Sequence, residues 1–107
     1  MIGIDQFRTV ELRVGTIRSA DAHPNADRLL VLRVDVGGEE RQIVAGIRAS
    51  YEPATLIGRQ VVVVTNLAPA TLRGVESQGM LLAAATDDGG VVVVSPERPV
   101  PAGAVVR

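Results

Sequence analysis

Short segments in which apolar and polar residues alternate dominate this chain of 107 residues. Alternation at every second position is typical of a β-strand with one buried face. Five strand-like segments, alternating or wholly apolar, follow one another, at residues 10–14, 30–36, 42–47, 60–67 and 80–85. The sequence therefore predicts a nearly all-β fold built from five principal strands.

One helical segment interrupts this series, between the third and fourth strands. In the stretch SYEPATLIG, residues 50–58, Ser50 suits a helix N-cap, Pro53 a first turn and Gly58 the position after a helix end. Five strands with a helix in this place follow the order of the OB-fold, a small Greek-key barrel. A five-stranded immunoglobulin-like fragment is the alternative, but it requires no helix there.

The length favours a single domain covering residues 1–107, with the barrel at about residues 8–85. Residues 86–107 exceed what a minimal OB barrel needs and are predicted to form a C-terminal β extension. They begin with the turn sequence Asp-Asp-Gly-Gly and continue with four valines at 91–94. Because these valines have no polar neighbours in alternation, both faces of the segment require cover, which a second copy of the chain could supply.

Composition excludes several classes of function. The chain has no cysteine, one histidine, a net charge of −1 and only arginine as basic residue. Disulfide and thiolate sites are excluded. No metal site, cofactor or catalytic constellation is predicted, because the lone His23 has no cysteine or paired nucleophile, and the nearby Asp21 and Asp27 are explained as solvated loop residues. No segment resembles a signal peptide or a membrane span, so a cytoplasmic location is expected. Nucleic-acid binding would have to depend on a local patch.

Two polar stretches fall where an OB-fold keeps its binding loops. Residues 20–28 are expected to join strands one and two, and residues 68–79 to join strands four and five. Their candidate binding residues are Asn25, Arg28, Arg73, Ser77 and Gln78. Phe7 and Tyr51, the only aromatic residues, lie outside both stretches, so stacking of single-stranded bases is poorly served. A folded RNA bound through its shape and backbone fits better.

Five blocks in order resemble the tRNA-binding domain family: VELRVG, HPNADRLL, RQIVAGI, YEPATLIG and NLAP...LRGVESQGMLLAA. The family includes free-standing tRNA-binding proteins, the C-terminal domain of methionyl-tRNA synthetases and the related secretion chaperone CsaA. The resemblance implies an OB-fold, homodimerisation and structure-specific tRNA binding. By position, Asn66, Arg73, Ser77 and Met80 match its loop and fifth-strand motif, and Asn25 and Arg28 match its first-loop motif. Ala70 and Thr71 are neutral where the family often has basic residues.

Each candidate residue also has a plainer interpretation. Arg73 could pair with Glu76, Met80 could fill the core, Asn25 could shape a turn, and Ser77 and Gln78 could cap local backbone. For the dimer interface the candidates are Ile4, Phe7, Val92 and Val94, although the N-terminal residues could equally be ordinary core. Two further functions stay open: a CsaA-like peptide-binding chaperone and a domain that pairs synthetase subunits.

Overall fold

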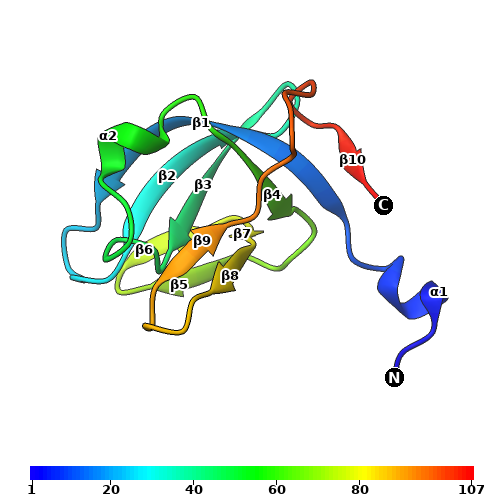
Figure 1. Ribbon diagram of the computed structural model, residues 1–107, viewed down its shortest axis with the longest axis horizontal. Coiled ribbons are helices and arrows are strands. Elements are labelled where there is room, and N and C mark those ends of the chain that lie inside the picture. The colour runs from blue at the N-terminus through cyan, green and yellow to red at the C-terminus, as the bar shows by residue number, and fades with distance from the viewer.

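A single antiparallel sheet rolled into a barrel forms the body of the protein (Figure 1). The computed structural model describes residues 1–107. The five strands of the barrel lie in the order β3, β2, β1, β4, β7. Their bounds are β1 Leu12–Ala22, β2 Leu30–Asp35, β3 Glu40–Ala45, β4 Gln60–Val64 and β7 Met80–Leu81. This order, with a helix between β3 and β4, confirms the predicted OB-fold barrel.

Strand β1 is much longer than the segment 10–14 predicted from alternation. Its first half pairs with β4, from Leu12 opposite Val64 to Thr16 opposite Gln60, and its second half pairs with β2. The register shifts between Ile17 and Ser19, where the strand bends. The sequence TIRSADA has no clear apolar alternation there, so pairing with β2 extends the strand beyond its local signal.

The core lies inside the barrel and combines side chains from residues between Ile17 and Val93. Ile17, Leu32, Ile43 and Val63, one from each of four neighbouring strands, are fully buried. Each such side chain contributes roughly 1.5–3 kcal/mol through removal of apolar surface from water. Helix α2, Pro53–Leu56, adds the fully buried Leu56, so the predicted helix is present but shorter than residues 50–58.

The segment predicted as a fifth strand, 80–85, divides into two. Residues Met80–Leu81 (β7) pair with β4, whereas Ala83–Ala85 (β8) pair with Val91–Val93 (β9) around the predicted Asp-Asp-Gly-Gly turn. Val93 points into the core, and Val92 and Val94 are exposed. Only one face of the valine segment is thus covered by the chain itself.

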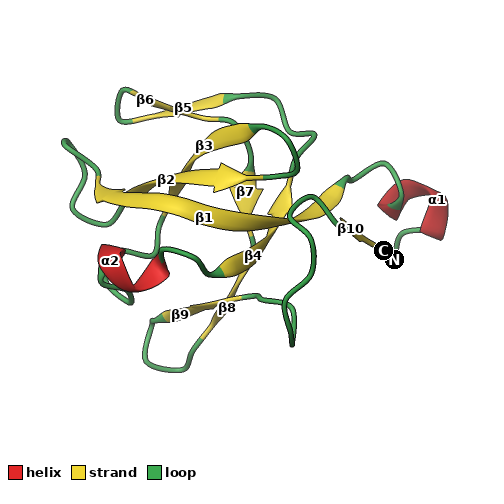
Figure 2. Ribbon diagram, turned by 90° about the horizontal axis from the view of Figure 1, so that it is seen from above, coloured by secondary structure: helices red, strands yellow, loops and turns green.

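The C-terminal segment returns to the barrel. Gln60 accepts a hydrogen bond from the N–H of Val100 at 3.0 Å and donates one to its carbonyl at 2.7 Å. The last strand, Val105–Val106 (β10), pairs with the start of β1. Both termini lie at the same end of the molecule (Figure 2), although Figure 1 shows them apart from each other.

An N-terminal helix, α1 at Ile4–Phe7, was not predicted. It stands away from the barrel (Figure 1), and Ile4 and Phe7 are exposed instead of forming core. Neither helix has the length and apolar character needed to cross a bilayer.

Candidate nucleic-acid interface

The polar insert before β7 is a β-hairpin, which corrects the prediction of a loop at 68–79. Strand β5, Ala70–Leu72, pairs with β6, Val75–Ser77, through a two-residue turn at Arg73 and Gly74. Both turn residues have positive φ, 52° and 89°, as the tight turn of a right-twisted hairpin requires. Arg73 is the one residue other than glycine with positive φ. The turn presents its side chain at the exposed tip of the hairpin.

Side chains, in addition to backbone, attach this hairpin to β3, beside which it lies in Figure 2. The N–H of Gln78 donates to the carbonyl of Gln42 at 2.7 Å, and the N–H of Gln42 donates to Oε1 of Gln78 at 3.1 Å. The N–H of Val44 donates to Oγ of Ser77 at 3.0 Å, and that hydroxyl donates to the carbonyl of Gly79 at 2.9 Å. The hairpin is therefore held by the free edge of the barrel.

The first loop is shorter than the predicted stretch 20–28, because β1 continues through Ala22 and leaves residues 23–29 as the connection. The N–H of His23 donates to the carbonyl of Leu29 at 3.1 Å and closes the loop. Arg48, which follows β3, also holds this loop, because its guanidinium donates a hydrogen bond to the carbonyl of Ala26 at 3.2 Å. Sequence reasoning missed Arg48, since no local pattern signals a contact between residues so far apart in the chain.

The loop and the hairpin meet at the Arg73 turn. The side-chain amide of Asn25 donates to the carbonyl of Arg73 at 3.5 Å, and the His23 ring bonds to the carbonyl of Leu72 at 2.9 Å. His23 is 3% exposed. Its burial and its place between the two segments were not predicted.

A hollow of about 330 Å³ lies at this junction, and its lining includes Arg28, Arg73 and the acidic Asp27. Neither arginine has an acidic partner, because the ion pairs of the structure are Arg13 with Glu11, Arg18 with Asp35 and Arg41 with Glu39. Pairing of Arg73 with Glu76 is excluded, and the Glu76 carboxylate instead accepts a hydrogen bond from Gln78. The structure thus brings Asn25, Arg28 and Arg73 together and leaves both guanidinium groups available to an anion.

Three other candidates are placed differently. Ser77 is 4% exposed, and its hydroxyl is used by Val44 and Gly79, so it cannot reach a ligand directly. Asn66 accepts from the N–H of Glu11 at 2.8 Å and donates to the carbonyl of Thr9 at 2.7 Å, which fixes the N-terminal segment. The interpretation of Met80 as core filler is wrong, because it is 48% exposed.

Met80 lines an apolar groove of about 340 Å³ between the end of β3 and strands β7 and β8. The groove is bordered by residues 44–47, 80–83 and Val91. It lies along the seam where the two end strands of the barrel sheet approach without a ladder of backbone hydrogen bonds.

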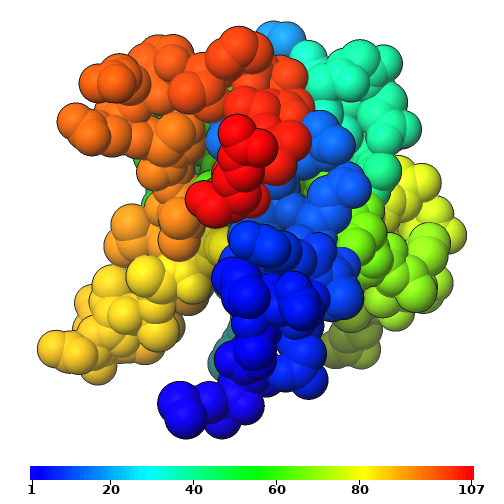
Figure 3. Space-filling view, turned by 90° about the vertical axis from the view of Figure 1, so that its right-hand side faces the viewer, coloured from blue at the N-terminus to red at the C-terminus, as the bar shows by residue number.

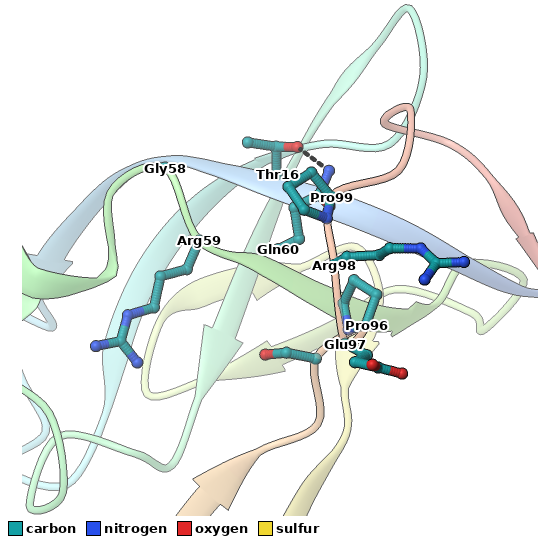
Figure 4. A pocket seen from close by; sticks show the side chains of 9 residues that line it. Thr16, Gly58, Arg59, Gln60, Pro96, Glu97, Arg98 and Pro99 are labelled. Atoms are coloured by element: carbon teal, nitrogen blue, oxygen red, sulfur yellow. Dashed lines mark hydrogen bonds between the residues drawn. The ribbon is translucent and has the colours of Figure 1, made fainter.

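A further hollow of about 380 Å³ lies between the start of β4 and the proline segment 95–99 (Figure 4). Thr16 and Gln60, which are hydrogen-bonded to each other at 3.1 Å, form part of its wall. The side chains of Arg59 and Arg98 point away from one another. These arginines therefore do not converge on one anion.

The ionisable groups with shifted pKa lie outside the interface. A hydrogen bond from Thr65, reinforced by Arg13, lowers the pKa of Glu11. The N–H of Gly37, reinforced by Arg18, lowers that of Asp35, and the Thr86 hydroxyl lowers the pKa of Asp88. Within the interface, Arg28 and Arg73 are balanced in formal charge by Asp27 and Glu76, so any attraction for an anion there is local to the two guanidinium groups.

The fold and its two adjoining polar segments define a small OB-fold binding module. The family model described as "Putative tRNA binding domain" matches residues 12–105, and the chain belongs to this family. It is 51% identical over 107 residues to a methionine–tRNA ligase of Thermococcus kodakarensis, covering 99% of this chain and 14% of that protein. The chain thus spans about a seventh of the length of this relative.

Solved structures agree with this assignment. A methionyl-tRNA-synthetase-related protein from Pyrococcus horikoshii superposes with a TM-score of 0.93 at 39% identity, covering 100% of this chain and 98% of the other. The chaperone CsaA from Bacillus anthracis superposes with a TM-score of 0.91 at 31% identity, covering 100% and 99%. The resemblance found in the sequence is confirmed.

Proposed function

We propose that the chain is a non-catalytic module that binds folded tRNA through loop 23–29 and the β5–β6 hairpin. The observation that carries the proposal is that Arg28 and Arg73 line one hollow and that neither forms an ion pair, although Asp27 lines the hollow as well. A guanidinium group offers a planar fork of donors that matches the oxygens of a phosphate. Membership of the tRNA-binding-domain family supports tRNA as the source of those phosphates.

The remaining candidates have distinct parts in this proposal. Asn25 supplies a polar contact beside the arginines, Gln78 holds the base of the hairpin through Gln42, and Met80 contacts a ribose or base at the edge of the apolar groove. Ser77 and Asn66 act through the backbone that they hold in place. No aromatic side chain lies in the interface, which supports reading of a folded backbone over stacking of splayed bases.

We also propose that two copies of the chain work as a homodimer, in the cytoplasm and in association with an aminoacyl-tRNA synthetase. The exposed side chains of Ile4, Phe7, Val92 and Val94 support pairing. Figure 3 shows a recess between the N-terminal residues and the β8–β9 hairpin. The similarity to methionine–tRNA ligases supports the location and the association with a synthetase.

The test is binding of bulk tRNA followed by fluorescence anisotropy across a salt series, with an RNA duplex of equal length as competitor. We expect the affinity for tRNA to fall steeply with salt, because phosphate contacts release counterions. We also expect the duplex to compete poorly with tRNA. Failure to bind tRNA at low salt would refute the proposal. Equal competition by the duplex would refute recognition of tRNA shape.

A second candidate is binding of apolar peptides, and the groove beside Met80 is the observation that favours it. Similarity to the chaperone CsaA adds support. Burial of apolar side chains depends little on salt, so peptide binding would persist where tRNA binding is lost. Binding of a denatured protein, measured in the same assay with and without about 0.5 M salt, separates the two functions.

A further inference from the structure

His23 is a buried side chain that forms hydrogen bonds with both segments of the interface. Its Nε2 lies 2.9 Å from the carbonyl oxygen of Leu72, the last residue of β5. Its Nδ1 accepts a hydrogen bond from the N–H of Asn25 at 2.9 Å. One ring therefore connects the first loop to the residue that precedes the Arg73 turn.

The two hydrogen bonds define the protonation state of this ring. The carbonyl of Leu72 can only accept, so Nε2 carries the hydrogen, and the N–H of Asn25 can only donate, so Nδ1 is bare. Both bonds are made by a single neutral tautomer. A proton added to Nδ1 would face the N–H of Asn25 and replace an attraction by a clash of two donors.

The ring also determines where the ligand-facing groups lie. Asn25, whose backbone the ring holds, reaches from the loop to the carbonyl of Arg73. Arg28 belongs to the same loop and lines the hollow together with Arg73. Loss of the ring contact would release the loop from the hairpin. Ligand binding would then have to order both segments, which lowers the affinity.

We propose that neutral His23 is a positioning residue that fastens loop 23–29 to the β5–β6 turn, and that protonation of its ring weakens RNA binding. The inference rests on the proposed function for its RNA consequence. It concerns the regulation of the site by pH, not the contacts made to the phosphates.

The chain makes such an effect unusually easy to detect. His23 is its only histidine, and it contains neither cysteine nor lysine. Imidazole is the side chain that ordinarily changes charge between pH 5 and 8. The charged side chains on the segments around the ring are Asp21, Asp27, Arg28, Arg48, Arg73 and Glu76, and none of them bonds to it.

The experiment compares tRNA binding by wild-type protein and by His23→Gln between pH 7.5 and 5.5, approximate limits that bracket imidazole titration. The glutamine amide can donate to Leu72 as Nε2 does, but it takes up no proton. We expect the affinity of wild-type protein for tRNA to fall roughly threefold or more across this range, as the loss of about one hydrogen bond would cause. The affinity of the variant should not change with pH. Parallel curves for the two proteins would overturn the proposal.

His23→Ala adds a second measurement, because it removes both bonds. A folded alanine variant should bind tRNA roughly threefold or more weakly than His23→Gln at pH 7.5. Wild-type affinity in that variant would overturn the positioning role. If it does not fold, the comparison of wild-type and His23→Gln still decides.

NMR of the free protein separates failure of this inference from failure of the proposed function. Protonation of the ring should shift the amide signals of Asn25 and Arg73 together with the ring signals. Absence of tRNA binding at every pH would refute the proposed function and the RNA consequence. Fixed Asn25 and Arg73 signals during ring titration would instead overturn the fastening of the loop, whatever RNA does.

Discussion

The backbone N–H of Val44 donates a hydrogen bond to the buried hydroxyl of Ser77, 33 residues further along the chain, at 3.0 Å. Val44 lies on the end strand of the barrel sheet, so its outward N–H has no strand ladder to pair with. Ser77 supplies that partner from the hairpin that carries Arg73. The Ser77 side chain thus gives the edge N–H of Val44 an acceptor and helps to position the hairpin that carries Arg73.

Replacing Ser77 by alanine should lower the free energy of unfolding by about 1–3 kcal/mol, because the N–H of Val44 is left buried without an acceptor. Urea denaturation followed by circular dichroism measures the change. Ser19→Ala is the matched control, since the Ser19 side chain makes no hydrogen bond within the protein, and it should stay within about 0.5 kcal/mol of wild type. Equal stability of the two variants would show that the Ser77 hydroxyl does not hold the hairpin.

Replacing Arg73 by asparagine should weaken all tRNA species by a similar factor, about three- to tenfold, and reduce the salt slope by about one contact. Asparagine tolerates the left-handed conformation that Arg73 adopts, so the turn survives. Anisotropy titrations with several purified tRNAs provide the measurement.

Arg98→Asn is the control for charge alone, because Arg98 is exposed on the proline segment and lies outside the interface. It should bind tRNA nearly as wild type does. Loss of affinity for one tRNA species alone would contradict a backbone contact by Arg73, because phosphates carry no base information.

The order of strands and the helix could be predicted from sequence because these signals are local. Alternation and apolar runs identified segments that pair in the barrel, and Pro53 identified the helix. The hairpin was missed because its strands have three residues each, and its turn places an arginine where glycine or asparagine is the usual signal. The second half of β1 was missed because its pairing with β2 is tertiary.

The interface was predicted as a set of residue types, and its internal connections were not. Asn25, Arg28 and Arg73 were named from their loops, and the structure brings them together. The contacts of His23 with Leu72 and of Arg48 with Ala26 join residues 49 and 22 positions apart. Such contacts follow from the way the sheet rolls into a barrel, for which no short motif is a signal.

Replacing Val92 by aspartate should convert the proposed homodimer into monomers at micromolar concentration. Val92 is 52% exposed on β9, so a carboxylate there leaves the folded monomer intact but would be buried without a partner in a dimer. Sedimentation velocity measures the change. Ile57→Asp is the control, since Ile57 is 55% exposed after α2, and it should stay dimeric. A monomeric wild-type protein would refute the dimer.

Lowering the pH should destabilise the fold in part through Asp35, whose carboxylate accepts hydrogen bonds from the N–H of Gly37 at 2.9 Å and from Arg18 at 3.1 Å. These bonds hold the pKa of Asp35 lower in the folded than in the unfolded protein. The folded state therefore binds fewer protons, and the contribution is complete above the unfolded pKa, near 4, and is lost as the pH falls below it.

Urea midpoints measured between about pH 6 and pH 3, on either side of the usual carboxyl range, test this linkage. Asp35→Asn should be less stable than wild type at the upper pH, because the charge-assisted bonds are weakened, and should lose less stability on acidification. Asp5→Asn, at an exposed carboxylate that accepts no hydrogen bond, should follow the wild-type pH dependence. If Asp35→Asn shows the same pH dependence as wild type, the ionised carboxylate of Asp35 does not stabilise the turn at Gly37.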